Sequence, residues 1–197
     1  GTADLTGSAV YAGTINLNSA GNTLILTGVT TTGYTINGGA AADTITGGEN
    51  GDVIYGNGGV DTIDGGGGND TIYGGAGADI LKGGAGDDAI YVDTAADIVS
   101  GEQYDGGTGN DTLYLNFQAN SDLSATSLTG VEGLQQNYYS YDVAMTAAQL
   151  DALTYLYGYS FTLTTGGAVS MSGVTVNSNG SFYLAAAGNT FDLTGAL

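Results

Sequence analysis

The sequence predicts an all-β protein in which short parallel strands wind into a β-solenoid. Three observations predict this fold. A nine-residue motif occurs eight times between Gly38 and Tyr114, each copy has Asp at position six, and each has a branched aliphatic residue at position eight. One copy cannot bury its single aliphatic side chain alone, so the copies must stack and share a core.

Each copy divides into a turn and a strand. The first four residues are rich in Gly, which favours a tight turn with positive φ angles, and in the three-residue strand that ends the copy only position eight points inward. The copies are GGAAADTIT (38–46), GGENGDVIY (47–55), GNGGVDTID (56–64), GGGGNDTIY (65–73), GGAGADILK (74–82), GGAGDDAIY (83–91), VDTAADIVS (92–100) and GGTGNDTLY (106–114). The predicted inward residues are Ile45, Ile54, Ile63, Ile72, Leu81, Ile90, Val99 and Leu113.

The composition of the turns predicts calcium sites. Carbonyl oxygens of a glycine-rich turn can point to a common centre, and the Asp at position six adds a hard anionic oxygen, a combination that favours calcium. Imidazole and thiolate sites are excluded because the chain has no His and no Cys. The alternative is that Asp only caps the turns. The predicted metal ligands are Asp43, Asp52, Asp61, Asp70, Asp79, Asp88, Asp97, Asp111, Gly38, Gly47, Gly56, Gly58, Gly65, Gly67, Gly74 and Gly83.

The motif resembles the G-G-x-G-x-D-x-U-x repeat of the RTX family of secreted bacterial proteins, over about seventy-five of the 197 residues. The resemblance implies a right-handed parallel β-roll with two repeats per coil, and about five or six calcium ions. The aspartates would then form two columns, Asp43, Asp61, Asp79 and Asp97 on one edge and Asp52, Asp70, Asp88 and Asp111 on the other, with a five-residue insertion at Gly101–Asp105.

Two features of these columns carry expectations. Carboxylates on neighbouring strands, about 4.8 Å apart, repel by roughly 1 kcal/mol in water and about 3 kcal/mol at an effective dielectric of 20. A core of one aliphatic residue per nine does not offset this, so folding is expected to depend on calcium. Val92–Ser100 contains no glycine, which makes a site at Asp97 the weakest of the set.

The flanking segments, residues 1–37 and 115–197, are predicted as separate β-rich regions. Alternating aliphatic residues in Thr14–Leu17 and Asn22–Thr27 predict further solenoid turns before the repeats. After the repeats, Thr146 begins a capping box that predicts a short helix over 146–155. Strands are expected at 159–165, 168–177, 181–185 and 190–194.

The two ends of the chain resemble each other. Gly13–Gly28 and Gly180–Gly195 share nine of sixteen residues. One interpretation is a unit cut from a tandem array, and the other is a pair of solenoid turns built from similar β sequence.

The charge of the chain limits its partners. The formal net charge is −19, Lys82 is the one cationic side chain, and fourteen of the 20 acidic residues lie between Asp43 and Asp111. This charge excludes nucleic acid and anionic membranes as direct electrostatic partners, and no apolar run is long enough for membrane insertion. Weak calcium modules are extracellular, so the expected location is the bacterial surface or medium, with type I export implied by the resemblance.

No enzyme is predicted, because a chain without His and Cys lacks His-based triads and thiol chemistry. Three hypotheses remain. The first is a calcium-dependent structural module of a surface-layer or surface matrix protein. The second is a ligand-binding module of an RTX adhesin, and the third is the calcium-triggered secretion and folding domain of a type I exported enzyme.

Tyrosines bear on the choice of partner. Position nine predicts a column of Tyr55, Tyr73, Tyr91 and Tyr114 on one outer face, while the opposite face carries Thr46, Asp64, Lys82 and Ser100. The column either stabilises the sheet by packing or forms a contact surface. The contact surface would serve self-association, binding to a larger parent chain, or binding to a cell-surface glycan.

Overall fold

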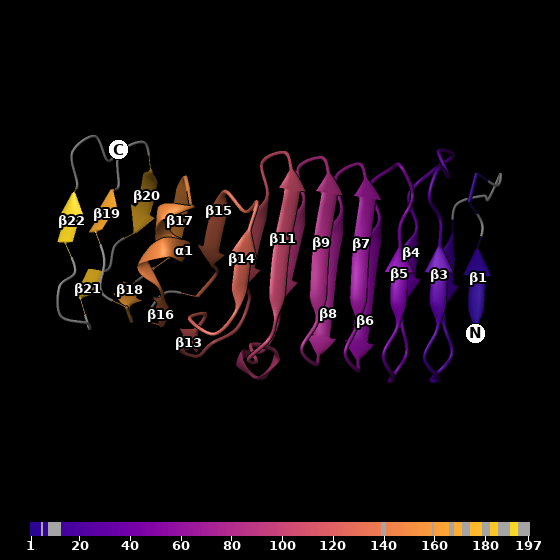
Figure 1. The fold of residues 1–197 in the computed structure, drawn as a ribbon, viewed down its shortest axis with the longest axis horizontal. Coiled ribbons are helices and arrows are strands. Elements are labelled where there is room, and N and C mark those ends of the chain that lie inside the picture. Colours follow the sequence, from indigo (N-terminus) through magenta and orange to yellow (C-terminus); the bar gives the residue numbers. More distant parts are fainter. Residues whose placement is uncertain are drawn as a thin grey trace.

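The computed structural model describes residues 1–4, 6–7, 13–138, 141–158, 160–165, 168–170, 174–178, 182–184 and 190–192. Their strands wind into one elongated solenoid, with β1 at one end and β22 at the other (Figure 1). Every strand pairing among these residues is parallel. The predicted all-β parallel solenoid is therefore confirmed.

Two long sheets form the faces of the solenoid, and consecutive strands alternate between them. Sheet A contains β1 (Thr2–Asp4), β3 (Thr23–Ile25), β5 (Thr44–Thr46), β7 (Thr62–Gly67), β9 (Ile80–Ala85), β11 (Gln103–Thr108) and β14 (Ser127–Thr129). Sheet B contains β2 (Thr14–Asn16), β4 (Thr35–Asn37), β6 (Val53–Gly58), β8 (Thr71–Ala76), β10 (Ala89–Val92), β12 (Thr112–Leu115), β15 (Gly133–Gln136), β17 (Tyr155–Gly158) and β20 (Thr175–Ser178).

The core between the two sheets is a double row of position-eight side chains. Seven of the eight predicted inward residues are at most 1% exposed, namely Ile45, Ile54, Ile63, Ile72, Leu81, Ile90 and Leu113. Burying each such side chain stabilises the fold by about 1.5–3 kcal/mol. The eighth prediction, Val99, is wrong because the side chain that pairs with Leu81 in the next strand is Tyr104, which is 1% exposed.

Tyr104 takes the inward position predicted for Val99 because the additional residues of this coil lie earlier in the chain than predicted. Residues 93–101, here called the long turn, leave sheet B after Val92 and contain the 3-10 helix η1 (Ala95–Asp97). Strand β11 then pairs Gln103 with Ile80. The predicted insertion at Gly101–Asp105 is therefore wrong, because most of that segment is regular strand and the extra residues lie in the long turn.

The solenoid also continues on the N-terminal side of the repeats, as predicted. Strands β2 and β4 add to sheet B, and β1 and β3 add to sheet A. The coils there are longer than those of the repeats. The amide of Asn22 donates to the carboxylate of Asp43, which is 21 residues away, whereas Asp43 and Asp61 are 18 residues apart.

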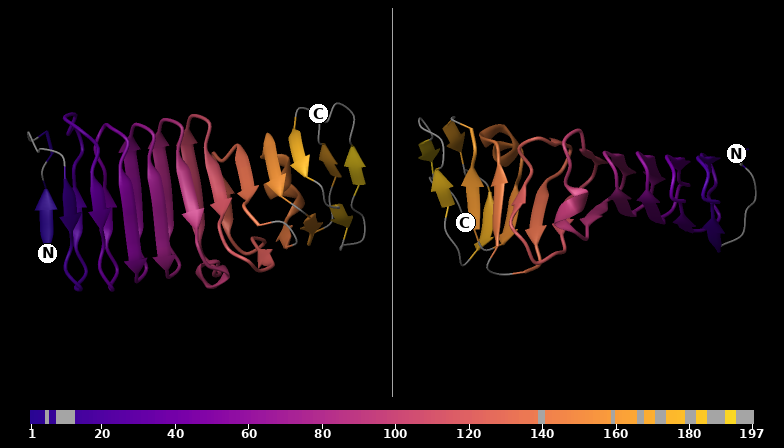
Figure 2. Two further views of the ribbon diagram at one scale, coloured as in Figure 1. Left: turned by 180° about the vertical axis from the view of Figure 1, so that it is seen from behind. Right: turned by 90° about the horizontal axis from the view of Figure 1, so that it is seen from below.

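Beyond the repeats the solenoid becomes wider, as Figure 2 shows in the view from below. A four-stranded sheet of β13 (Ser121–Asp122), β16 (Asp142–Met145), β18 (Ser160–Leu163) and β21 (Phe182–Leu184) is added, with a pair formed by β19 (Ala168–Ser170) and β22 (Thr190–Asp192). The single strand predicted at 168–177 is wrong, because β19 and β20 belong to different sheets. The similar end segments thus contribute solenoid strands, although most of Gly180–Gly195 lies outside the described residues.

The predicted capping box is present at the helix α1 (Ala147–Asp151), where the Thr146 side chain accepts a hydrogen bond from the Gln149 amide. The helix ends at Asp151 and does not reach Tyr155. The amides of Thr154 and Tyr155 instead donate to the carbonyl of Glu132. Strand β17 of sheet B begins with this pairing.

Candidate metal centres

The aspartates at position six form two continuous hydrogen-bonded columns, one along each edge of the solenoid. In each column the backbone amide of one residue donates to the carboxylate of the next. Column one runs from Asp43 to Asp61, Asp79 and Glu102, with N···O distances of 2.7, 2.8 and 3.2 Å. Column two runs from Asp52 to Asp70, Asp88, Asp111 and Glu132, with distances of 2.6, 2.7, 2.7 and 2.9 Å.

The order of these columns differs from the predicted one at one position and includes two further acidic residues. Glu102, and not Asp97, follows Asp79 in column one, because β11 pairs directly with β9. Glu132 continues column two. Both glutamates directly precede a strand, which is the signal that could have identified them in the sequence. A motif that requires Asp at this position does not find them.

The second carboxylate oxygen in these columns lacks a partner. Within the described part of the chain, five such buried oxygens accept no hydrogen bond, the Oδ2 atoms of Asp61, Asp70, Asp79, Asp88 and Asp111. A buried carboxylate oxygen without a partner costs free energy. The columns therefore contain an acceptor that the protein itself does not satisfy.

The first glycine of each repeat shows what faces this oxygen. A Cβ atom on Gly56 would lie 2.5 Å from Asp61 Oδ2 and would also meet the carbonyl oxygen of Gly74. The same pair of oxygens surrounds the corresponding point at Gly38, Gly47, Gly65, Gly83 and Gly106. A carboxylate oxygen and a carbonyl oxygen thus converge where a side chain is absent, as a hard cation requires.

The other predicted glycines differ. A Cβ atom on Gly74 would meet Asp79 Oδ2 at 2.6 Å, but its next contact is the side chain of Leu81 and no carbonyl. Cβ atoms on Gly58 and Gly67 would contact Ala40 and Glu49 instead of a column. The first residue of the turn, not the third, therefore borders the candidate sites.

The first aspartate of each column is different from those that follow. Asp43 accepts from the amides of Asn22 and Gly39, at 2.7 Å each. Asp52 accepts from the amides of Tyr34 and Gly48. Both oxygens of these two carboxylates are therefore occupied by protein, which leaves less capacity for a cation than at Asp61 or Asp70.

The residues fit calcium when the carbonyls are included. Among the described residues no three acidic side chains already converge around one point, so backbone carbonyls must supply part of any coordination shell. A bound divalent cation would supply positive charge between carboxylates of neighbouring strands. The donor set of carboxylate and carbonyl oxygens suits calcium.

Without a cation the columns favour protonation. Burial raises the pKa of Asp70 to about 8, and the charges of Asp88 and Asp52 act in the same direction. Burial likewise raises the pKa of Glu102 to about 8 and those of Asp61 and Asp88 to about 6.

A pH dependence follows for the calcium-free chain. Because the folded-state pKa values are raised, the destabilisation by these carboxylates is complete above about pH 8 and decreases as pH falls towards the unfolded values near 4. We expect the β signal in calcium-free buffer, measured by circular dichroism, to increase as the pH is lowered from 9 to 5. A β signal that stays constant or decreases as the pH is lowered over this range would contradict the buried columns.

No helix among the described residues is long and apolar enough to cross a membrane.

A scan against models of protein families matches the RTX calcium-binding nonapeptide repeat, in 4 copies, to residues 35–63, 64–99 and 100–120. A search of the curated proteins and a search of the solved structures each found no match. The family match covers the two carboxylate columns as far as Asp111 and the double row of inward side chains. Residues 35–120 of this chain are therefore RTX calcium-binding nonapeptide repeats, folded as a parallel β-roll.

Proposed function

We propose that the chain is a calcium-dependent structural module of a bacterial surface-layer or surface matrix protein, which folds and becomes rigid on binding calcium outside the cell. The observation that carries this proposal is the set of five buried carboxylate oxygens without partners. They make the solenoid unfavourable until a cation is supplied. RTX repeats are typical of secreted bacterial proteins, where millimolar calcium is present.

The outer face of sheet B supports a role in assembly. Tyr55, Tyr73, Tyr91 and Tyr114 stack with centroid distances of 4.7, 5.0 and 4.6 Å and interplanar angles of 13°, 18° and 9°. The opposite face carries Thr46, Asp64, Lys82 and Asp105 in register. Asp105 takes the place predicted for Ser100, again because of the long turn.

The stacking favours self-association over glycan binding. A sugar stacks on the face of an aromatic ring, but each ring in this column covers the faces of its neighbours. The edges and hydroxyl groups remain for contact. A ridge of ring edges suits packing against another flat sheet, of a second copy or of a larger parent chain.

The assembly proposal is tested by replacing Tyr55, Tyr73 and Tyr91 together with Ser. We expect calcium binding to be retained, because no tyrosine of the column contributes to the carboxylate columns, and ordered assembly to be lost. Electron microscopy of calcium-loaded protein measures this. The matched control replaces Thr44, Thr46 and Thr62 of sheet A with Ser. If the tyrosine variant still forms the same sheets or filaments, the tyrosine column only stabilises its own sheet and is not a contact surface.

Catalysis is not part of the proposed function. The chain has no His and no Cys, and the buried acids of residues 38–114 belong to the columns. The adhesin and export-domain hypotheses remain the alternatives. A native chain that stays monomeric at high calcium and high concentration would favour the export domain, and calcium-dependent binding to cell-surface sugars would favour the adhesin.

A further inference from the structure

The outer face of sheet A carries a groove, here called the polar groove, on the side of the solenoid opposite the tyrosine column. It has a volume of about 250 Å³ and runs across β5, β7 and β9, lined by Thr46, Glu49, Asp64, Gly66, Lys82 and Ala85 among others. Sheets A and B are the two faces of the solenoid (Figure 1). Each copy of the chain therefore presents the groove on one face and the tyrosine column on the other.

The groove results from the glycine at the second position of the turn. Position nine of a copy points outward, and the next outward position along the strand is position two of the following copy. Gly66 has this place after Asp64. Its φ angle is 101°, and a Cβ atom there would lie 2.3 Å from the carbonyl oxygen of Gly48. A side chain cannot occupy this position, so the gap beside Asp64 is a fixed consequence of the repeat.

The charged side chains of the groove are already held in place. Asp64 Oδ1 accepts from the Gly66 amide at 3.1 Å, and Asp64 Oδ2 accepts from Lys82 Nζ at 3.1 Å. Glu49 Oε1 accepts from the Gly28 amide at 3.2 Å. The side chains of Lys82 and Asp64 are nevertheless 47% and 37% exposed, so a partner can reach them. Binding a partner requires little further ordering of these groups, which lowers the entropic cost of association.

The size and composition of the groove fit protruding side chains better than a separate small molecule. Pockets for small molecules enclose about 300–1,000 Å³ and are mostly apolar, whereas this groove is smaller and is lined by charged and hydroxyl groups. The net charge of −19 excludes an anionic ligand. The partner that fits is a neutral surface with hydrogen-bonding groups that repeat at the spacing of the coils.

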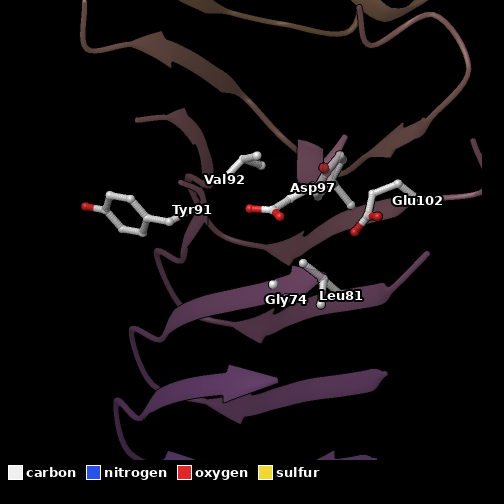
Figure 3. A pocket seen from close by; sticks show the side chains of 8 residues that line it. Gly74, Leu81, Tyr91, Val92, Asp97 and Glu102 are labelled. Atoms are coloured by element: carbon white, nitrogen blue, oxygen red, sulfur yellow. The ribbon is translucent and has the colours of Figure 1, made fainter. Parts of the chain in front are cut away.

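The tyrosine column of another copy has these properties. Tyr91 points outward, away from the core residue Leu81 (Figure 3). Because the rings stack face to face, a neighbouring molecule meets their edges and hydroxyl groups. The edge of an aromatic ring is the positive part of its quadrupole, so it is attracted to the carboxylates of Asp64 and Glu49. A phenol hydroxyl can also donate to a carboxylate or accept from the Lys82 ammonium group.

The two surfaces have the same period. Tyr55 pairs with Tyr73 in sheet B as Thr46 pairs with Asp64 in sheet A, and both steps are 18 residues. The ring centroids are 4.6 to 5.0 Å apart, close to the strand spacing of about 4.8 Å in a sheet. Successive tyrosines therefore meet successive coils of the groove when two solenoids lie with their axes parallel.

We propose that the polar groove receives the tyrosine column of a second copy of this chain. The inference rests on the proposed assembly through the tyrosine column and identifies the surface that accepts it. Column and groove are different surfaces on opposite faces, so the contact is heterologous and continues from copy to copy without closing. Copies stack with sheet B of one against sheet A of the next. Lys82, the one cationic side chain, then lies where two negatively charged chains meet.

Filling the groove tests this inference. Thr46→Tyr places in the groove the side chain that position nine carries on sheet B, so the calcium-loaded protein should associate about tenfold or more weakly than the native chain. Ser127→Tyr is the matched control, because it adds the same side chain at an exposed position of sheet A, on β14 and outside the groove. It should associate like the native chain. Sedimentation velocity measures association, and circular dichroism in calcium checks that both variants are folded. Equal association of the two variants would overturn the inference.

A mixing experiment separates the two surfaces. The variant with Tyr55, Tyr73 and Tyr91 replaced by Ser keeps the groove, and Thr46→Tyr keeps the tyrosine column. Each variant alone should be monomeric, and an equimolar mixture should form dimers that do not grow further.

Contact between two tyrosine columns predicts a different result. Thr46→Tyr would then assemble alone, and the mixture would form no complex of the two variants. That result would overturn the inference and leave the proposed assembly intact. A native chain that stays monomeric in calcium, or a serine variant that assembles like the native chain, would overturn the proposed assembly together with the inference.

Discussion

Removing calcium at neutral pH is expected to unfold most of the β-roll. A ligand at a hundredfold excess over its dissociation constant stabilises the folded state by about 2.7 kcal/mol. Five unpartnered aspartate oxygens mark the places where such ions are needed. The summed effect is of the same order as the whole stability of a domain, about 5–15 kcal/mol. Circular dichroism should therefore show loss of most of the β signal in excess chelator and its recovery when calcium is returned.

Magnesium provides the control for this experiment. Magnesium at the same concentration should restore little of the β signal, because it requires near-octahedral geometry and gives up its waters reluctantly. A spectrum and a melting temperature that are unchanged by the chelator would contradict the calcium dependence. In that case the aspartates at position six would only cap the turns.

Replacing Asp70 with Asn is expected to change stability in opposite directions with and without calcium. Asn keeps the oxygen that accepts from the Asp52 amide, but it removes a buried charge whose pKa is raised to about 8. Without calcium at pH 8, Asp70→Asn should therefore retain more β signal than the native chain. With calcium it should lose about 3–5 kcal/mol, because Asp70 borders candidate sites on both sides.

Asp43→Asn is the matched control. Asp43 begins column one, and both of its oxygens already accept backbone amides. Its replacement by Asn puts an amide group against one of those donors, so this variant should be less stable than the native chain in both conditions. Its loss of calcium affinity should be smaller than that of Asp70→Asn. Equal calcium affinities of the two variants, measured by titration, would contradict the two-column arrangement.

Much of the β-roll could be predicted because its rule is local. Each copy contains its own turn, its own inward residue and its own Asp, so reading Ile54 or Asp61 requires no knowledge of distant residues. The tyrosine column followed from the same period and is confirmed by ring stacking. The helix at Ala147 could be predicted from its capping box, which is also a local signal.

The error at Asp97 has a physical cause. With a fixed period of nine residues, Asp97, Ile98 and Val99 fall at positions six, seven and eight of a regular copy. In most of the regular turns the second residue has positive φ, as at Gly107 with φ 102°. The residue in that place after Ser100 would be Glu102, for which positive φ is costly. Gln103–Asp105, in contrast, is followed directly by Gly106 and Gly107, so this segment becomes the strand.

The C-terminal region offered no comparable rule. Its coils differ in length, and a third sheet begins at β13, so no fixed period relates one coil to the next. The division of 168–177 between two sheets depends on contacts with distant strands. Such contacts leave no signal in a single sequence.

The long turn sets a boundary for cooperativity. In a solenoid each coil interacts only with its neighbours, so binding propagates along the chain as in a one-dimensional lattice. An ion held between two coils orders the next coil and raises its affinity. This coupling extends without interruption along column two, from Asp52 to Glu132, whereas column one has regular turns only from Asp43 to Asp79 before the long turn. The steepness of a calcium titration therefore reports the length of the uninterrupted column and not the total number of repeats.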